Sequence, residues 1–367
     1  MKAVVCGGGT GGHIYPALAI AEALRRDGVE ILYMGAQDSL EQKLAANAGF
    51  PFQGVEACGL HRKSPRVILE LAHNFRGMRR AQRILRVERP DLVIGTGGFA
   101  EAPVVKAAQG LHLPTLLHEQ NAFPGLANRR LARQAQAVCL TFAEAGQYFP
   151  HPERLHTTGL PVRPAILSAS REDAWAYFQI SSSEQGRFTL LITGGSQGAA
   201  TLNEAALAAC PRLLAAGVRV ILICGVQHAF AVRQRLPQHE NLLLFPYLDA
   251  MQHALALADL AVARSGASFL AEAACIGLPT LLVPYPYAAN DHQRYNAQAF
   301  VAHEAALMIE DQALDGASLA DAVLKLKENP LRLTQMRRAA FSLAHRDAAQ
   351  KIVQIAYDLI AQSEKHG

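Results

Sequence analysis

Short apolar runs typical of buried strands alternate with longer amphipathic runs along the whole chain. In the first half, KAVVC, EILYMG, DLVIGTGG and PTLLHEQN are each followed by a stretch with helical spacing, and AVCLTF closes the series. The alternation begins again with FTLLITGG and continues through RVILICG, LLLFPYL, LAVARSG and PTLLVPYP. Strands and helices that alternate in this way are typical of βαβ units on a parallel sheet. The pattern predicts an α/β protein built from two similar halves.

The length of 367 residues suits two domains, each with a core of its own. Pro161 and Pro164 place a linker near residue 163, because proline disfavours helix at its own position and just before it. The expected domains are residues 1–163 and 164–345. The last segment, 346–367, is expected to form a helix that packs back on the N-terminal half. Its apolar face is formed by Ile352, Ile355, Ala356 and Leu359.

Composition narrows the class of protein without identifying it. Half of the residues are hydrophobic and 18% are charged, as in an ordered globular protein. The six cysteines show no C-x-x-C spacing, so neither a disulfide framework nor a zinc site is expected. No apolar run reaches the roughly 18 residues of a membrane span, and no signal-peptide core precedes the first glycines.

The first candidate site is the glycine turn GGGTGGH after the first strand. Gly7, Gly9 and Gly12 match G-x-G-x-x-G, and such a turn exposes backbone N–H groups to a phosphate at a helix N-terminus. A nicotinamide site also needs an acidic residue at the end of the second strand, but EILYMG ends in glycine. His13 adds an imidazole in the first turn of the helix. The turn alone leaves three alternatives: a diphosphate, a nicotinamide cofactor, or strand–helix packing.

A second glycine turn, TGGSQGA, occupies the corresponding place in the second half. Gly195, Ser196 and the neighbouring glycines suit a diphosphate, with the helix N-terminus expected at residues 196–199. Further along, Glu272 lies in an apolar helix, where a carboxylate needs a partner such as a ribose diol. A solvated glutamate on the helix surface is the alternative.

Taken together, these motifs resemble one family. GGGTGGHIYPALA, TGGFAEAP, HEQNAFPGLANR, GLPVR, TGGSQGA, YLDAM and RSGASFLAEAACIGLPTLLVPYPYAANDHQRYNA occur in the order and spacing of the MurG family of bacterial N-acetylglucosaminyltransferases. The resemblance implies a GT-B fold, with two Rossmann-like domains facing across a cleft. It also implies transfer of GlcNAc from UDP-GlcNAc to the C4 hydroxyl of MurNAc in undecaprenyl-diphospho-MurNAc-pentapeptide (lipid I), which gives lipid II.

The resemblance also implies the site residues. The donor-binding positions are Arg163, Gly195, Ser196, Gln197, Leu248 through its backbone at the uracil, Glu272 at the ribose, and His292 and Gln293 at the sugar. The acceptor's diphosphate is assigned to Thr10, Gly11, Gly12 and His13. His13 and Asn121 are the expected catalytic residues, with His13 the first candidate for the base because imidazole titrates near neutrality. A hydrogen-bond donor to the acceptor phosphate is an almost equal alternative for His13, and structural roles are expected for His118 and Glu119.

Several positions depart from the family pattern. The loop Phe99–Pro103 contains Glu101 where small residues are usual, which puts a carboxylate beside the expected acceptor site. Leu160 replaces a common asparagine, Asn290 a common aspartate, and His292 a glutamine found in some members.

The segment from His61 to Pro90 carries nine Lys or Arg against two Glu, although the whole chain has a net charge of only +4. A solvated helix face is the default explanation of such a run. Because a lipid-linked acceptor must be reached without an anchor, docking to an anionic membrane surface is favoured over that explanation. The expected location is the cytoplasmic face of the bacterial membrane, as a peripheral protein. Nucleic acid is not expected as a partner, because no aromatic platform accompanies the arginines.

No D-x-D pair is present, so neither a catalytic metal nor another cofactor is expected. Three other functions remain open from the sequence. A UDP-GlcNAc 2-epimerase would share the fold and donor site but needs no acceptor turn. A nicotinamide dehydrogenase depends on one glycine pattern, and a non-catalytic UDP-sugar sensor would bind without releasing UDP.

Overall fold

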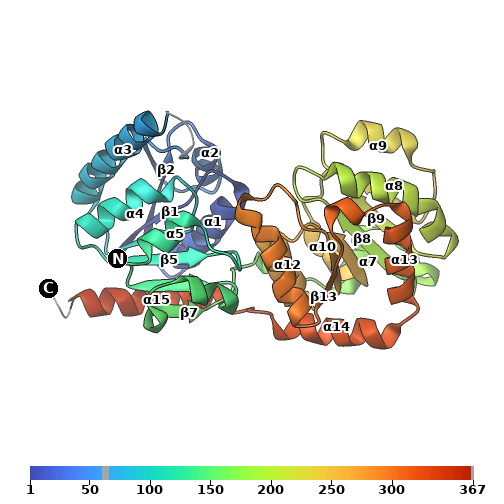
Figure 1. The fold of residues 1–367 in the computed structure, drawn as a ribbon. Helices are drawn as coiled ribbons and strands as arrows, with labels where there is room; N and C mark the ends of the chain where they lie inside the picture. The colour runs from blue at the N-terminus through green and yellow to red at the C-terminus, as the bar shows by residue number, and fades with distance from the viewer. Residues whose placement is uncertain (60–65, 365–367) are drawn as a thin grey trace. The chain divides into compact units, whose positions relative to one another are not determined.

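The computed structural model describes residues 1–59 and 66–364. They form two compact units: Met1–Pro161 with Asp347–Gly367 (unit 1), and Val162–Arg346 (unit 2). Each unit has its own sheet and its own helices (Figure 1). The chain first passes from unit 1 to unit 2 after Pro161, two residues before the linker position, residue 163, that the prolines predict.

The described sheet of unit 1 is parallel, in the order β3-β2-β1-β4-β5-β6-β7. Its strands are β1 (Lys2–Cys6), β2 (Glu30–Ala36), β3 (Phe52–Val55), β4 (Leu92–Gly95), β5 (Thr115–Glu119), β6 (Ala137–Leu140) and β7 (Leu155–Thr157). Val4 in β1 pairs with Leu32 on one side and Val93 on the other. Because helices cover both faces, the central strands are buried along their length and read as continuous apolar runs.

The helices of unit 1 include the last helix of the chain. They are α1 (Gly11–Arg26), α2 (Leu40–Asn47), α3 (Val67–Glu88), α4 (Glu101–Gly110), α5 (Leu126–Leu131) and α15 (Ala348–Glu364). Ile352 and Ala356 of α15 are fully buried in the same hydrophobic cluster as Ile20 and Leu24 of α1. The C-terminal helix therefore belongs to the core of the N-terminal unit.

Unit 2 repeats the design with the described strand order β10-β9-β8-β11-β12-β13, again parallel. The strands are β8 (Thr189–Thr193), β9 (Arg219–Ile223), β10 (Leu242–Phe245), β11 (Leu260–Ala263), β12 (Thr280–Leu282) and β13 (Ala306–Met308). The helices are α6 (Pro164–Leu167), α7 (Arg171–Tyr177), α8 (Ala200–Ala215), α9 (Ala229–Arg235), α10 (Met251–Leu257), α11 (Ala267–Ile276), α12 (His292–Ala302), α13 (Gly316–Lys327) and α14 (Pro330–Ser342).

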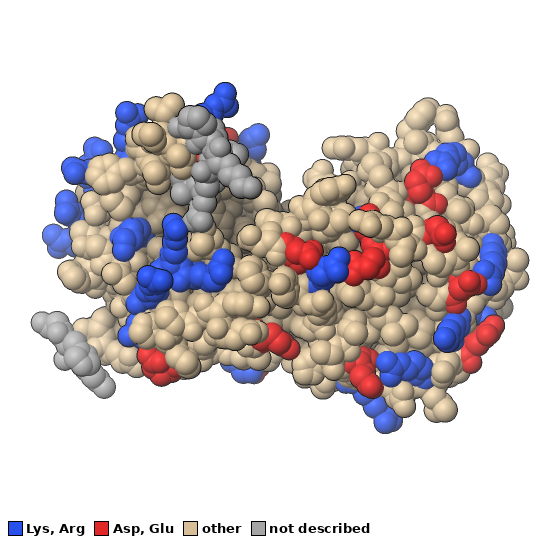
Figure 2. Space-filling view, viewed as in Figure 1, with Lys and Arg blue, Asp and Glu red and all other residues tan. Residues whose placement is uncertain are grey.

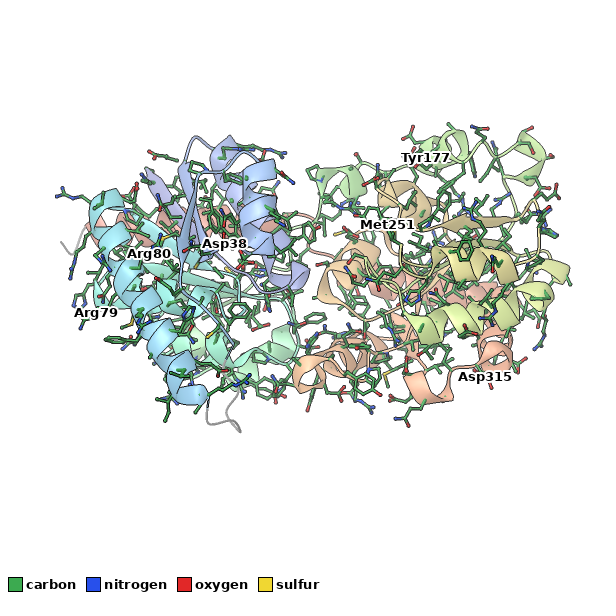
Figure 3. The ribbon with its side chains drawn as sticks, turned by 90° about the horizontal axis from the view of Figure 1, so that it is seen from above. Asp38, Arg79, Arg80, Tyr177, Met251 and Asp315 are labelled. Atoms are coloured by element: carbon green, nitrogen blue, oxygen red, sulfur yellow. The ribbon has the colours of Figure 1, made fainter. Side chains whose placement is uncertain are left out.

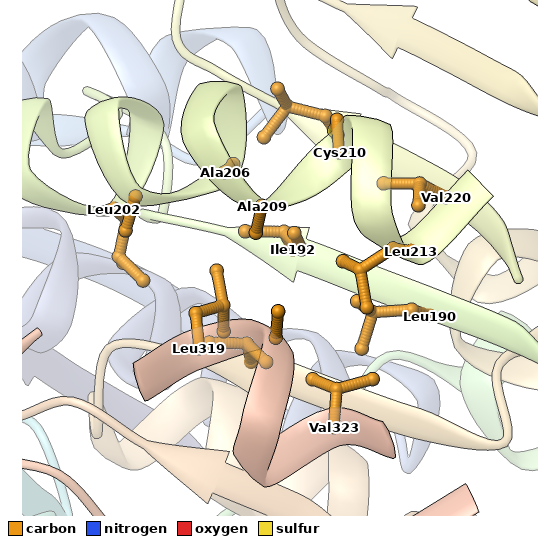
Figure 4. Close-up of a cluster of buried hydrophobic side chains, with 14 of the residues drawn as sticks. Leu190, Ile192, Leu202, Ala206, Ala209, Cys210, Leu213, Val220, Leu319 and Val323 are labelled. Carbon is orange, nitrogen blue, oxygen red and sulfur yellow. The ribbon is translucent and has the colours of Figure 1, made fainter. Parts of the chain in front are cut away.

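The core of unit 2 shows how closely its layers pack. Leu190 and Ile192 of β8 lie in one buried cluster with Leu202 of α8 and Leu319 of α13 (Figure 4). A Cβ added to Gly316, the first residue of α13, would lie 2.4 Å from the Cβ of Ala208. The glycine thus permits close contact between the two helices.

The strand orders predict where a ligand binds. In unit 1 the chain moves outward from β1 through β2 to β3 and then returns to β4 on the other side of β1. In unit 2 the same reversal occurs between β8 and β11. Crevices at the carboxyl ends of such strands are the usual ligand sites of open α/β sheets. Both glycine turns follow these strands.

No helix among the described residues is long and apolar enough to cross a membrane.

Candidate functional site

The first glycine turn joins β1 to α1, and two of its N–H groups donate to residues outside the turn. The N–H of Gly8 donates to the Gly97 carbonyl at 3.3 Å, and that of Gly9 donates to the Glu41 carboxyl at 3.4 Å. Gly9 has φ +89°, and a Cβ there would lie 2.6 Å from the Phe99 ring. A side chain is therefore disfavoured at Gly9 both by backbone strain and by the ring.

The start of α1 offers the N–H groups that an anion can use. The helix begins at Gly11, after Thr10, whose side chain makes no capping hydrogen bond. The N–H groups of Gly11 and Gly12 belong to the first turn, where no earlier carbonyl of the helix can accept them. Thr10 and Gly12 are exposed. The sequence-predicted acceptor residues thus lie together at one helix N-terminus.

His13, in the same helical turn, packs on the loop that follows β4. Its Nδ1 lies 3.1 Å from the Thr96 carbonyl and 2.9 Å from Oε1 of Gln120. Gly97 has φ +98°, and a Cβ there would lie 2.7 Å from Nδ1. The imidazole therefore packs against the backbone of Gly97, where a larger residue would leave no room. The two contacts of Nδ1 fix the orientation of the ring.

The HEQN segment ends β5 and forms a buried hydrogen-bonded turn. Glu119 accepts the N–H of Asn121 at 3.0 Å, the N–H of Gly125 at 3.0 Å and the amide of Asn128 at 2.9 Å. His118 is fully buried, and burial lowers its pKa to about 4. Both residues have the contacts expected of structural residues. Asn121 lies two residues after Glu119, at the carboxyl edge of the sheet.

Glu101 does not present its carboxylate beside the acceptor turn. It is the first residue of α4, is fully buried, and accepts the N–H of Gly97 at 2.6 Å. Burial raises its pKa to about 8, against the opposing effect of that hydrogen bond. The carboxyl that departs from the family pattern is therefore directed inward, behind the loop that supports His13.

The second glycine turn, after β8, leaves its polar residues exposed. Gly195 has φ +83° and donates its N–H to the Thr193 hydroxyl at 3.3 Å, while Ser196 and Gln197 are exposed. Helix α8 begins at Ala200. Ala199 is the N-cap, so the helix N-terminus lies at the last residue of the expected segment 196–199, after a turn that Gly195 and Gly198 extend with left-handed conformations.

The structure brings together Arg163 and Glu272, which are separated by more than a hundred residues. Arg163 Nε donates to Glu272 Oε1 at 3.1 Å. The Glu272 side chain is 14% exposed and that of Arg163 is 52% exposed. Burial raises the pKa of Glu272, and the charge and hydrogen bond of Arg163 oppose this. The pair therefore places an exposed guanidinium beside a largely buried carboxylate.

Gln293 and His292 begin α12 behind an unusual backbone turn. Asn290 and Asp291 both have left-handed φ values, 53° and 55°, which non-glycine residues rarely adopt. Gln293 Oε1 accepts the N–H of Tyr285 at 3.0 Å, and His292 Nδ1 lies 2.8 Å from the carbonyl of Ala289. Both predicted sugar-binding side chains are thus held locally by backbone groups.

Leu248 follows β10, and its side chain is only 7% exposed because it packs in the hydrophobic cluster on one face of the unit 2 sheet. Its side chain is therefore a core group, and its backbone is the part that a ligand could contact.

The chain matches two models of one family. The glycosyltransferase family 28 N-terminal domain matches residues 3–140, and the C-terminal domain of the same family matches residues 189–352. The chain belongs to glycosyltransferase family 28.

Two relatives match nearly the whole chain. One from Desulforamulus reducens, named UDP-N-acetylglucosamine--N-acetylmuramyl-(pentapeptide) pyrophosphoryl-undecaprenol N-acetylglucosamine transferase, is 39% identical over 378 residues, or 99% of this chain and 100% of that protein. A protein of the same name from Moorella thermoacetica is 41% identical, with 97% and 98% of the two chains covered.

Solved structures confirm the predicted GT-B fold with two Rossmann-like domains. The MurG structure from Acinetobacter baumannii has a TM-score of 0.79 at 27% identity, with 97% of this chain and 99% of that chain covered. The calicheamicin glycosyltransferase CalG4 has a TM-score of 0.72 at 16% identity, covering 99% and 98% of the two chains. UDP-GlcNAc 2-epimerase from Neisseria meningitidis has 0.67 at 14%, with 96% and 99% covered. The last two similarities show the fold alone.

The structure of this family 28 chain also places polar residues that the sequence analysis missed. Arg264, directly after β11, is 9% exposed and pairs with Asp311 at 2.5 Å. Its guanidinium also donates to the carbonyls of Val283 and Pro284 at 3.1 Å each. An arginine at the end of an apolar strand, in LAVARSG, was the available signal. Gln120 gave no such signal, because its partner is 107 residues away.

Proposed function

We propose that the chain transfers N-acetylglucosamine from UDP-GlcNAc to the C4 hydroxyl of MurNAc in lipid I, forming lipid II. The observation that carries this proposal is the 39–41% identity, over nearly complete chains, to transferases whose name states this donor and this acceptor. Each unit has one glycine turn at a strand end whose backbone is suited to bind an anion, and this supports a reaction between two diphosphate-containing substrates.

In this proposal unit 2 binds the donor. Gly195, Ser196 and Gln197 bind the diphosphate at the carboxyl end of β8. Glu272 accepts hydrogen bonds from the ribose hydroxyls. Arg163 uses Nε for Glu272, and its remaining N–H groups are directed at the diphosphate, where charge-assisted hydrogen bonds stabilise the leaving UDP. The remaining contacts are the Leu248 backbone at the uracil and His292 and Gln293 at the sugar.

Unit 1 binds the acceptor and removes its proton. The N-terminus of α1, from Thr10 to His13, binds the lipid diphosphate. The C4 hydroxyl oxygen attacks the anomeric carbon of GlcNAc, the bond from that carbon to the UDP oxygen breaks, and the hydroxyl proton passes to His13. Asn121 holds the donor sugar. A role for His13 as a hydrogen-bond donor to the acceptor phosphate is the competing assignment.

Release of UDP from UDP-GlcNAc, measured in EDTA with and without a lipid I analogue, tests the reaction. Release that requires the acceptor and survives chelation is expected. Release without any acceptor would favour an epimerase or hydrolase instead, and donor binding without release would favour a sensor. In the same assay Glu272→Gln should raise the KM for UDP-GlcNAc by about 10-fold or more, because a charge-assisted hydrogen bond is lost. An unchanged KM would remove Glu272 from the donor site.

The proposal also includes docking to an anionic membrane surface through α3. Ile68 and Phe75 are 73% and 51% exposed and share a helical face with Arg79 and Arg83. The Arg79 guanidinium lies 5.1 Å from the Phe75 ring centre, and Arg79 lies on the exposed side of α3 in Figure 3. Figure 2 shows Lys and Arg along the edge of unit 1 where α3 runs. Arg62 and Lys63, which the sequence analysis included in this basic segment, lie outside the described residues.

A further inference from the structure

A chain of buried hydrogen bonds runs from the His13 ring into the core of unit 1. Nδ1 of His13 lies 2.9 Å from Oε1 of Gln120. Nε2 of Gln120 lies 3.0 Å from Nδ1 of His118 and donates to the His118 carbonyl at 2.9 Å. Nε2 of His118 lies 3.0 Å from the carbonyl of Gly159. Gln120 and His118 are 1% and 0% exposed, so these groups are sheltered from bulk water.

Three backbone carbonyls determine the direction of every hydrogen bond in this chain, because a carbonyl oxygen can only accept. The carbonyl of Gly159 requires a proton on Nε2 of His118, which leaves Nδ1 of that neutral ring as an acceptor. The carbonyl of His118 requires the NH2 side of Gln120 to face it. The oxygen of Gln120 then faces His13.

The second hydrogen-bond partner of His13 Nδ1, the Thr96 carbonyl at 3.1 Å, also requires Nδ1 to be the donor. A flipped Gln120 amide would place its oxygen against the His118 carbonyl and its NH2 against Nδ1 of His13. The arrangement is therefore self-consistent in one orientation only, with a proton on Nδ1 of His13.

We infer that Gln120, oriented by His118, is a positioning residue that holds neutral His13 as the Nδ1–H tautomer and leaves Nε2 as its basic nitrogen. No described residue hydrogen-bonds to Nε2 in the structure. This inference rests on the proposed function, in which His13 accepts the C4 hydroxyl proton. Here a neutral amide does what an aspartate does in a catalytic triad, where a hydrogen bond to one imidazole nitrogen fixes the tautomer.

His118, at the buried end of this series of hydrogen bonds, is suited to orient Gln120 because its charge does not change near neutral pH. Burial lowers the pKa of His118 to about 4, so the ring stays neutral and its Nδ1 keeps accepting from Gln120. A charged His118 would donate from Nδ1 and would repel the Gln120 NH2 group. The neutral ring therefore maintains the amide orientation.

The tautomer can be measured directly in the full chain with 15N-labelled histidine, with the His13 signal assigned by its loss in His13→Ala. Wild-type protein should show His13 protonated on Nδ1, and a ring protonated on Nε2 would overturn the inference. Gln120→Met keeps the side-chain volume and removes the acceptor, leaving the Thr96 carbonyl. The ratio of Nδ1–H to Nε2–H should then fall about five-fold, as expected for one hydrogen bond. An unchanged ratio would also overturn the inference.

Kinetics separate this inference from the proposed function. Gln120→Met should lower kcat about ten-fold and leave the KM for UDP-GlcNAc within about two-fold, because the donor is assigned to unit 2. Gln109→Met is the matched control, since Gln109 donates to the Leu131 carbonyl elsewhere in unit 1. A shifted tautomer with normal turnover would overturn the role of Gln120 in the reaction. Wild-type protein that fails to transfer would overturn the proposed function while leaving the tautomer result intact.

Discussion

Glu101 shows how one buried side chain makes the stability of unit 1 depend on pH. Its Oε2 accepts a hydrogen bond from the Gly97 N–H, while Oε1 is buried without a hydrogen-bond partner among the described residues. Burial raises the pKa of Glu101 from 4.5 to about 8. Between these values the folded state keeps a proton that the unfolded state has released. The free energy of unfolding must therefore fall as pH rises through this window.

Glu101→Gln should abolish this pH dependence, because the amide has the same shape and no charge at any pH. Relative to wild type, the variant should gain roughly 1 kcal/mol of stability for each pH unit between about 5 and 8. Urea unfolding followed by far-UV circular dichroism at several pH values measures the difference. Trp175, the single tryptophan, lies in unit 2 and reports on that unit separately.

The control for Glu101 is a glutamate whose side chain is mostly exposed. Glu153→Gln changes the same charge in unit 1, where the Glu153 side chain is 64% exposed. Its stability relative to wild type should stay nearly constant with pH. If Glu101→Gln behaves like Glu153→Gln, the buried carboxyl is already ionised near neutrality and the argument is wrong.

At the scale of the element, α3 combines two different surfaces. From Gly77 onward it packs on unit 1 through Ala81 and Leu85, and a Cβ at Gly77 would lie 1.8 Å from the Glu56 carbonyl. Leu71, which shares the helical side of Met78 and Leu85, is nevertheless 52% exposed, because the core contacts only the later turns. The first turns therefore leave an apolar surface exposed, which a solvated basic helix does not need.

Arg79→Gln with Arg83→Gln should weaken binding to vesicles that contain anionic lipid by about 10-fold or more, since each arginine near such a surface contributes about 1 kcal/mol. Sedimentation with anionic and with neutral vesicles measures this. Ile68→Ser with Phe75→Ser should weaken binding to both kinds, because apolar contact does not depend on lipid charge.

The matched control removes two exposed arginines from unit 2, Arg233→Gln with Arg338→Gln, and changes the net charge equally. It should bind as the wild type does. Equal binding of wild-type protein to the two kinds of vesicle would refute electrostatic docking, and an equal loss in the control would show a nonspecific charge effect.

Across the whole molecule, the sequence predicts well what depends on local pattern. Buried strands such as Leu92–Gly95 and the turns at Gly9 and Gly195 follow from apolar runs and from backbone that only glycine adopts readily. Contacts between distant segments are not encoded locally. The pairing of Arg163 with Glu272 and the inward direction of Glu101 depend on tertiary packing, so no spacing in the sequence could reveal them.

Because α15 packs in the core of unit 1, the stability of unit 1 depends on the last helix of the sequence. Ile352 is fully buried in the cluster that includes α1, so Ile352→Asn should destabilise unit 1 by several kcal/mol through lost burial and an unsatisfied polar group. Unit 2 has a separate core.

Thermal unfolding of the variant, monitored by circular dichroism, should show a lower melting temperature for unit 1. The melting temperature reported by Trp175 fluorescence and the affinity for UDP-GlcNAc should stay near wild type, while the rate of transfer falls. Gln354→Ala, on the exposed side of α15, should leave all four measurements unchanged. Loss of donor binding in Ile352→Asn would mean that unit 2 depends on unit 1 for its fold or for its donor site.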